Sequence, residues 1–146
     1  SQGIEPIWSN SYVKDIAKIK TTIKNPFLVD LLEEKGQNTT EVWRSIRDFD
    51  GSVQHLDFLS ENEKDVFKTY PEIDQNVIVY QAANRQNHID QGQSINVMVH
   101  PDMPVKDVNN IYITAWKLGV KSMYYQHSMN AAQKFKQKKS CDSCEG

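Results

Sequence analysis

Cysteine is scarce in this sequence of 146 residues, and it is confined to one end of the chain. The two cysteines, Cys141 and Cys144, are separated only by Asp142 and Ser143. A disulfide between them would close a loop so short that it would hardly constrain the unfolded chain. The sequence therefore excludes a fold that depends on disulfide bonds.

Long apolar runs and an excess of one charge are also missing. The longest uninterrupted apolar stretch, residues 77–80, is far shorter than the roughly 20 residues that cross a bilayer. The first residues lack the basic-then-apolar order of a signal peptide. A net charge of −2 provides no broad attraction for nucleic acid or anionic lipid. We therefore expect a soluble, cytoplasmic domain that binds neither nucleic acid nor membrane.

The first half of the chain contains several signals for the start of a helix. Residues 10–24 are rich in β-branched side chains and fit a strand followed by a turn or a short helix. Helix starts are then predicted at Asn25-Pro26, at Thr39-Thr40 and at Ser60, which forms a capping box with Glu63. These signals predict three helices in quick succession.

A longer helical pattern is predicted from Pro71 to about His88. Its apolar stripe is expected to contain Ile73, Val77, Tyr80 and Asn84, widened by Ile78 and Ala82. The polar run that follows, residues 84–94, is rich in amide and charged side chains. Because such groups are costly to bury without partners, this run is either a solvated loop or a hydrogen-bonded, packed junction.

The last third of the chain has the pattern of a strand, a helix and a second strand. Apolar residues alternate over residues 94–99, a helix is predicted from about Val105, and Gly119 is placed to end it. A strand-like run follows over residues 120–125. This order predicts a βαβ unit with two parallel strands that are neighbours or near neighbours in a sheet.

The segment from Met129 onward is rich in Asn, Ala, Gln and Lys, and we expect it to be a flexible tail, residues 129–146, behind a folded part, residues 1–128. Cys141 and Cys144 have the spacing of a redox motif. Zinc is disfavoured because the chain has no second cysteine pair, and the four histidines show no shared metal spacing. An exposed dithiol on a lysine-rich tether suits thiol–disulfide exchange.

Tyr124 and Tyr125 end the last predicted strand. Successive side chains on a strand point to opposite faces, so spacing alone predicts one packed tyrosine and one exposed tyrosine. Phosphate-binding loops, dinucleotide fingerprints and serine-nucleophile motifs do not occur in the sequence.

Three segments, taken in order, resemble the C-terminal part of the large, catalytic subunit of class I ribonucleotide reductases. The first is Gly-Ile-Glu-Pro at residues 3–6. The second runs from Ala-Ala-Asn-Arg-Gln at residues 82–86 through Ile-Asp-Gln-Gly-Gln-Ser-Ile-Asn at residues 89–96. The third is Ala-Trp-Lys-Leu-Gly-Val-Lys-Ser-Met-Tyr-Tyr at residues 115–125, followed by the tail cysteine pair. The resemblance covers nearly the whole chain.

The resemblance implies an α/β fold, in which this chain supplies the last strands and covering helices of a ten-stranded α/β barrel and ends in a flexible tail. In that family a radical-forming cysteine and a reducible cysteine pair lie within the barrel, and none of these three is present here. The family's substrate-phosphate loop would lie upstream of Ser1. The isolated chain is therefore expected to be inactive and to share a ribonucleotide site with another polypeptide.

The resemblance also implies roles for four residues. Tyr124 and Tyr125 match a tyrosine pair that relays a radical from the small subunit to the catalytic cysteine, with Tyr125 nearer the small subunit. Cys141 and Cys144 match a tail dithiol that re-reduces the active-site disulfide and is reduced by thioredoxin or glutaredoxin. No cofactor or metal is expected in this chain, whereas a diiron-type radical cofactor is expected in the partner small subunit.

The start at Ser1 leaves several explanations open. One is a naturally split large subunit, with an N-terminal chain as the partner, and another is a fragment of a longer chain. A serine at this position also suits the piece that follows an intein. The alternative functions are a non-catalytic interaction module, such as a decayed reductase fragment, and an independent dithiol oxidoreductase. The latter is disfavoured because the cysteines follow the last folded element.

Overall fold

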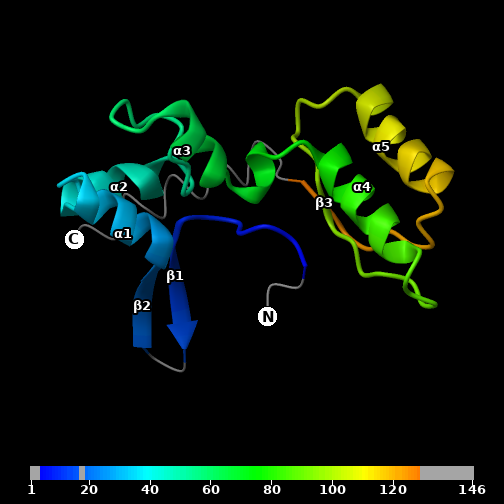
Figure 1. The fold of residues 1–146 in the computed structure, drawn as a ribbon, viewed down its shortest axis with the longest axis horizontal. Helices are drawn as coiled ribbons and strands as arrows, with labels where there is room; N and C mark the ends of the chain where they lie inside the picture. Colours follow the sequence, from blue (N-terminus) through cyan, green and yellow to red (C-terminus); the bar gives the residue numbers. More distant parts are fainter. Residues whose placement is uncertain (1–3, 17–18, 129–146) are drawn as a thin grey trace. The chain divides into compact units, whose positions relative to one another are not determined.

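A computed structural model describes residues 4–16 and 19–128 of the chain, whose elements are shown in Figure 1. These residues belong to two units. The first unit consists of Pro6–Ile73, and the second consists of the residues from Asp74 onward together with residues 4 and 5. Each unit has its own hydrophobic core. The predicted tail, residues 129–146, lies outside the described residues and contains both cysteines.

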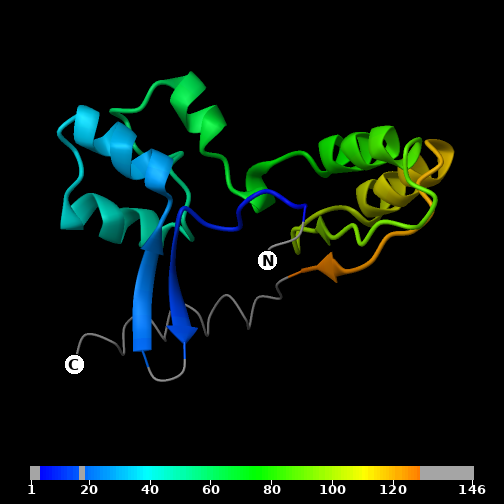
Figure 2. The same ribbon diagram turned by 60° about the horizontal axis from the view of Figure 1, so that its bottom comes forward.

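The first unit begins with a β-hairpin. Strand β1 (Ser11–Ile16) pairs in antiparallel fashion with β2 (Ile19–Lys24), in a register that places Ser11 opposite Lys24. The expectation of one strand followed by a turn or a short helix is therefore wrong for its second half. β-Branched residues such as Thr21 and Thr22 favour the extended backbone once a neighbouring strand is available. Figure 2 shows the hairpin projecting from the helices of this unit.

The three helices predicted next are confirmed, and each begins at the predicted cap. They are α1 (Pro26–Glu34), α2 (Thr40–Asp48) and α3 (Glu61–Val66). The side chains of Asn25 and Thr39 accept hydrogen bonds from the backbone of the first turn that follows each of them. Ser60 and Glu63 form the predicted capping box, with the Ser60 backbone N donating to Glu63 Oε2 at 2.7 Å. Local side-chain chemistry thus sets where these helices begin.

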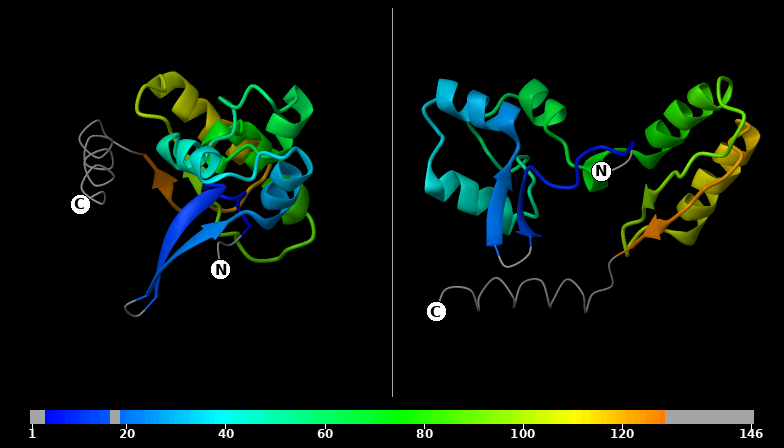
Figure 3. Two further views of the ribbon diagram at one scale, coloured as in Figure 1. Left: turned by 90° about the vertical axis from the view of Figure 1, so that its left-hand side faces the viewer. Right: turned by 90° about the horizontal axis from the view of Figure 1, so that it is seen from below.

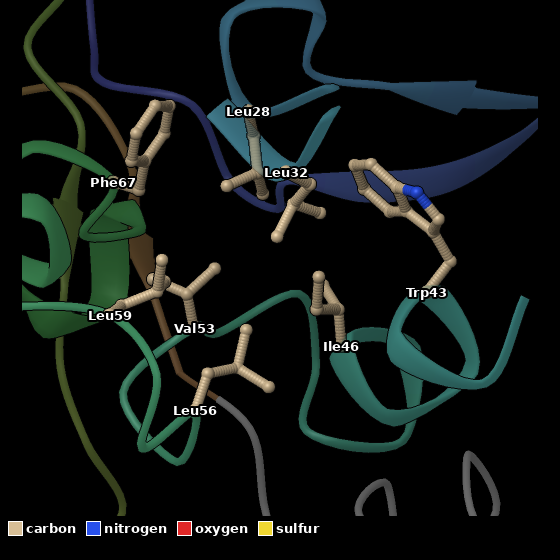
Figure 4. Packing of buried hydrophobic residues seen from close by; sticks show 8 residues of the cluster. All are labelled: Leu28, Leu32, Trp43, Ile46, Val53, Leu56, Leu59 and Phe67. Atoms are coloured by element: carbon tan, nitrogen blue, oxygen red, sulfur yellow. The ribbon is translucent and has the colours of Figure 1, made fainter. Parts of the chain in front are cut away.

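The core of the first unit lies between these helices and the loop that follows α2. It contains side chains spaced one helical turn apart on α1 and α2, together with residues of the loop and of the end of α3, as Figure 4 shows. Its buried members are Leu28, Leu32, Trp43, Ile46, Val53, Leu56, Leu59 and Phe67. The short helices of this unit are therefore held by shared burial, which isolated helices of this length lack.

A buried polar residue joins the hairpin to the rest of the first unit. Asn10 is fully buried and donates from Nδ2 to the carbonyl oxygens of Gly51, at 2.9 Å, and Phe67, at 2.8 Å. Its Oδ1 accepts a hydrogen bond from Asn25. The side-chain amide is thereby satisfied on both sides, which is the condition for burying it at low cost.

The second unit begins with α4 (Gln75–Gln86), four residues later than predicted. Pro71 belongs instead to a single 3₁₀ turn, η1 (Tyr70–Glu72), which is closed by a hydrogen bond from the Thr69 backbone N to Glu72 Oε2 at 2.7 Å. Ile73 then adopts an extended conformation, which ends this turn, and Asp74 caps the new helix. The predicted stripe is wrong for Val77 and Tyr80, which are exposed, and is confirmed for Ile78 and Ala82, which are buried. The buried residues of α4 are Gln75, Ile78, Val79, Ala82, Ala83 and Gln86.

The predicted βαβ unit is confirmed, with shorter strands than expected. Its elements are β3 (Val97–Met98), α5 (Val105–Lys117) and β4 (Gln126–His127), and the two strands pair in parallel. The alternation in the first strand is confirmed by the burial of Ile95, Val97 and Val99. The second strand begins one residue after the run predicted for it. Gly119 follows α5 with a φ of 78°, as a left-handed helix end requires.

Helices α4 and α5 cover one face of the β3–β4 pair, as Figures 2 and 3 show. The core between them contains Val79, Val97, Val99, Ile111 and Ala115. Because side chains alternate along a strand, Met98, which lies between the buried Val97 and Val99, belongs to the opposite face. Among the described residues, no helix is both long enough and apolar enough to cross a membrane.

Candidate functional site

Tyr124 and Tyr125 lie immediately before β4, beside the residues that lead into β3. The Tyr124 backbone N donates to the Ile95 carbonyl at 2.8 Å, and the Val97 backbone N donates to the Tyr125 carbonyl at 2.9 Å. Both tyrosines therefore form backbone hydrogen bonds with β3 or with the residues that lead into it. This attachment places the two phenols at one edge of the second unit's core.

The two phenol rings contact each other. Their centroids are 4.1 Å apart with an interplanar angle of 56°, within the range of favourable aromatic pairs. Tyr124 is 60% exposed and Tyr125 is 56% exposed. The expectation of one packed and one exposed tyrosine on opposite faces is therefore wrong, since both rings are exposed and lie together.

The contact also affects the pKa of Tyr124. A hydrogen bond with Tyr125 is the largest influence that raises the pKa of Tyr124 above its ordinary value of 10.0. The charge interaction between the two phenols and a small loss of solvation act in the same direction. Tyr124 therefore remains a neutral phenol throughout the neutral pH range. Two phenols whose rings are this close have the geometry to exchange an electron and a proton.

A network of side-chain amides fixes the segment that leads to the tyrosines. Gln86 Nε2 donates to the carbonyls of Ile89 and Gln91, at 3.0 and 2.9 Å, and Gln93 Nε2 donates to Gln86 Oε1 at 3.2 Å. Ser122 Oγ donates to the Gln93 carbonyl at 3.0 Å. The polar run over residues 84–94 is thus hydrogen-bonded through Gln86 and Gln93, whereas residues 87–92 are exposed, so each of the two interpretations is confirmed in part.

Two residues that the sequence did not assign to the site form a chain of hydrogen bonds that ends on the tyrosine backbone. Asn96 Oδ1 accepts a hydrogen bond from the Tyr125 backbone N at 3.1 Å. Glu5 Oε1 accepts from both the backbone N and Nδ2 of Asn96, at 3.1 and 2.8 Å. Both residues occur in the segments on which the resemblance rests, but their spacing gives no sign that they meet.

The first unit holds a second pair of potentially reactive groups. Ser45 Oγ lies 2.7 Å from His55 Nε2, and the Phe49 ring stacks on the imidazole at 4.0 Å. His55 Nδ1 is buried with no hydrogen-bond partner among the described residues. A serine nucleophile needs a base that a third group orients, so this pair lacks the catalytic arrangement. No group of three or more potential ligands that could hold a metal ion occurs in the described part of the chain.

We expect the stability of the chain to fall as the pH decreases through the range in which His55 titrates. Burial is the largest influence on this histidine and lowers its pKa below 6.5, in spite of the nearby carboxylates of Asp57 and Glu72. The unfolded state therefore binds the proton more readily, and the stabilisation present above pH 6.5 is lost below it. Chemical denaturation at a series of pH values measures this loss.

The matched variants for this measurement are His55→Gln and His88→Gln. His55→Gln removes the half-buried imidazole and should flatten the pH dependence of unfolding between about pH 7 and 5. His88 is exposed, so His88→Gln controls for the loss of an imidazole elsewhere. Equal flattening by the two variants would contradict the assignment to His55.

Comparisons with known proteins identify the family. The sequence model described as "Ribonucleotide reductase, barrel domain" matches residues 1–126. The chain is 43% identical over 131 residues to the ribonucleoside-diphosphate reductase large subunit of Invertebrate iridescent virus 3, covering 88% of this chain and 21% of that protein. It is 35% identical over 132 residues to the ribonucleoside-diphosphate reductase subunit alpha of Chlamydia trachomatis, covering 90% of this chain and 12% of that protein.

A solved structure agrees with these relatives. The alpha subunit of a class Id ribonucleotide reductase from Actinobacillus ureae superposes with a TM-score of 0.79 and is 54% identical in sequence. The match covers 89% of this chain and 23% of that subunit. The chain thus spans less than a quarter of the length of each of these relatives. From its sequence and its fold together, this chain belongs to the ribonucleotide reductase barrel-domain family.

Proposed function

We propose that this chain forms the C-terminal part of the large subunit of a ribonucleoside-diphosphate reductase, in which Tyr124 and Tyr125 relay a radical. The observation that carries the proposal is the contact between the two phenols, with ring centroids 4.1 Å apart, in a chain of this family. Within the assembled enzyme, the chain supplies the last strands of a ten-stranded barrel and the helices that cover them. The assembled enzyme reduces ribonucleotides to deoxyribonucleotides.

The relay consists of two hydrogen-atom transfers that involve this chain. The radical cofactor of the small subunit first oxidises Tyr125. The Tyr125 radical then takes an electron and a proton from the Tyr124 phenol and becomes a phenol again. The Tyr124 radical then takes an electron and a proton from a cysteine thiol, which leaves a thiyl radical. Each step takes the electron and the proton from the same phenol or thiol, and the hydrogen bond with Tyr125 raises the pKa of Tyr124 and so favours its protonated form.

The thiol that receives the radical comes from another part of the enzyme. The only cysteines of this chain, Cys141 and Cys144, both belong to the tail. We therefore infer that a partner N-terminal chain supplies the catalytic cysteine, the reducible pair and the remainder of the ribonucleotide site. By itself this chain is inactive, and the diiron-type radical cofactor belongs to the small subunit. We place the assembly in the cytoplasm.

The tail dithiol restores the active site after each turnover. Turnover leaves a disulfide in the active site, and the thiolate of Cys141 or Cys144 attacks it, so that the two electrons pass to the active site and the tail becomes a disulfide. Thioredoxin or glutaredoxin then reduces the tail. The four lysines between residues 134 and 139 favour the thiolate form through their positive charge.

Reconstitution tests this assignment. The chain is mixed with the matching N-terminal chain and small subunit, and deoxyribonucleotide formation is measured with thioredoxin or glutaredoxin as the reductant. We expect activity only when all the polypeptides are present, and co-purification of this chain with the N-terminal chain. A chain that neither co-purifies with nor activates its partners would instead be a non-catalytic reductase fragment.

A further inference from the structure

The parallel pairing of β3 and β4 is irregular at the tyrosine pair. The backbone N of Val97 donates to the Tyr125 carbonyl, and that of Val99 donates to the His127 carbonyl. In a regular parallel ladder, the residue that accepts from Val97 also donates its own amide to the carbonyl two residues earlier. Tyr125 would thus donate to Ile95. The Ile95 carbonyl instead accepts from Tyr124, one residue earlier in the chain.

This shift of one residue is a bulge in the tyrosine segment. On a regular strand the side chains of residues 124 and 125 would point to opposite faces of the sheet. A bulge changes the direction of a side chain relative to its neighbours. It therefore explains how two consecutive tyrosines bring their ring centroids within 4.1 Å of each other.

The bulge deprives the Tyr125 amide of its place in the ladder, and Asn96 takes the role of the missing acceptor. Asn96 Oδ1 lies 3.1 Å from the Tyr125 backbone N. A single oxygen of Glu5 accepts from both the backbone and the side chain of Asn96, which fixes the carboxamide with its oxygen toward Tyr125. The charge on Glu5 strengthens both of these hydrogen bonds.

We propose that Asn96, oriented by Glu5, is a positioning residue that stabilises the bulge and thereby holds the phenols of Tyr124 and Tyr125 in contact. This inference rests on the proposed radical relay. Its consequence is specific to one step, because Asn96 governs the transfer from Tyr125 to Tyr124. Oxidation of Tyr125 itself does not require the contact between the two rings.

Radical trapping in the assembled enzyme separates the two steps. 3-Aminotyrosine, which is easier to oxidise than tyrosine, is placed at position 125 in one enzyme and at position 124 in another, and the trapped radical is quantified by electron paramagnetic resonance. In the Asn96→Leu background we expect trapping at position 125 to persist. Trapping at position 124 should fall about tenfold, the effect of one lost hydrogen bond to an amide left without a partner. Asn109→Leu, at an exposed position of α5, is the matched control.

A charge exchange tests the geometry without removing polar groups. Asn96→Asp keeps an acceptor for the Tyr125 amide but places a second carboxylate against Glu5, so trapping at position 124 should decrease. Adding Glu5→Gln restores one carboxamide and one carboxylate to the pair, and trapping should recover. Recovery in the double variant supports the proposal and shows that the fold tolerates substitution at both positions.

The remaining outcomes overturn one proposal or the other. Unchanged trapping at position 124 in Asn96→Leu, or equal loss at both positions, would refute the positioning role of Asn96. Failure of the double variant to recover trapping would refute it as well. If Asn96 and Glu5 are intact and a radical is trapped at neither position 124 nor position 125, the relay itself would instead be refuted.

Discussion

We expect ribonucleotide reduction by the assembled enzyme to be almost completely lost when either tyrosine of the pair is replaced by phenylalanine. Phenylalanine keeps the ring and its packing but has no hydroxyl from which an electron and a proton can leave together. We expect Tyr124→Phe and Tyr125→Phe each to lower turnover by about a thousandfold or more, equivalent to about 4 kcal/mol in the barrier. Steady-state formation of deoxyribonucleotide measures the loss.

The assembly of the same variants must be followed at the same time. Both rings are more than half exposed, so loss of one hydroxyl should leave the fold and the subunit affinity unchanged. Tyr80→Phe is a matched control, because Tyr80 is similarly exposed, at 52%, and lies on another element, α4. Full activity in either Tyr124→Phe or Tyr125→Phe would exclude the relay.

We expect loss of either tail thiol to stop multiple turnovers with protein reductants. In Cys141→Ser and Cys144→Ser the remaining thiol can attack the active-site disulfide but cannot complete the exchange, because the resolving thiol is missing. We expect steady-state activity with thioredoxin or glutaredoxin to fall about a hundredfold, while a first turnover proceeds, since the barrier to the radical chemistry is unchanged. Product per enzyme in a single-turnover assay separates the two phases.

A small dithiol provides the control for this experiment. Dithiothreitol reaches a buried disulfide without the tail, so it should sustain turnover in the serine variants. Ser143→Ala changes one of the two residues between the cysteines without removing a thiol. The activity of this variant should match that of the unmodified chain. Equal steady-state activity of the cysteine variants with thioredoxin would show that the tail dithiol has no part in turnover.

Much of the local structure could be predicted because it depends on side chains near in sequence. Asn25, Thr39 and Ser60 each cap the helix that follows them, within three residues of the group that they bind. The βαβ unit was predictable for a similar reason, since alternating burial and a glycine helix end are local signals. The helical pattern predicts one continuous helix from Pro71. The structure instead has a 3₁₀ turn at Tyr70–Glu72, closed by Thr69 and Glu72, before the helix begins.

The site was harder to predict because its geometry depends on residues distant in the chain. The tyrosine pair was identified through the resemblance, whereas the rule of alternating faces predicted that the two rings would be apart. The one-residue shift in the ladder overrides that rule, and it is visible only when the partner of each backbone amide is known. The contact between Asn96 and Glu5 could not be predicted from local patterns either, because 91 positions separate the two residues.

That separation has a consequence for folding and for evolution. Glu5 and Asn96 belong to one unit, and the whole of the first unit, Pro6–Ile73, is inserted between them in the sequence. The entropy lost on closing a loop grows only with the logarithm of its length, so doubling the insertion would cost about 0.6 kcal/mol. Added residues in the inserted unit would therefore make the pairing of Glu5 with Asn96 only slightly less favourable.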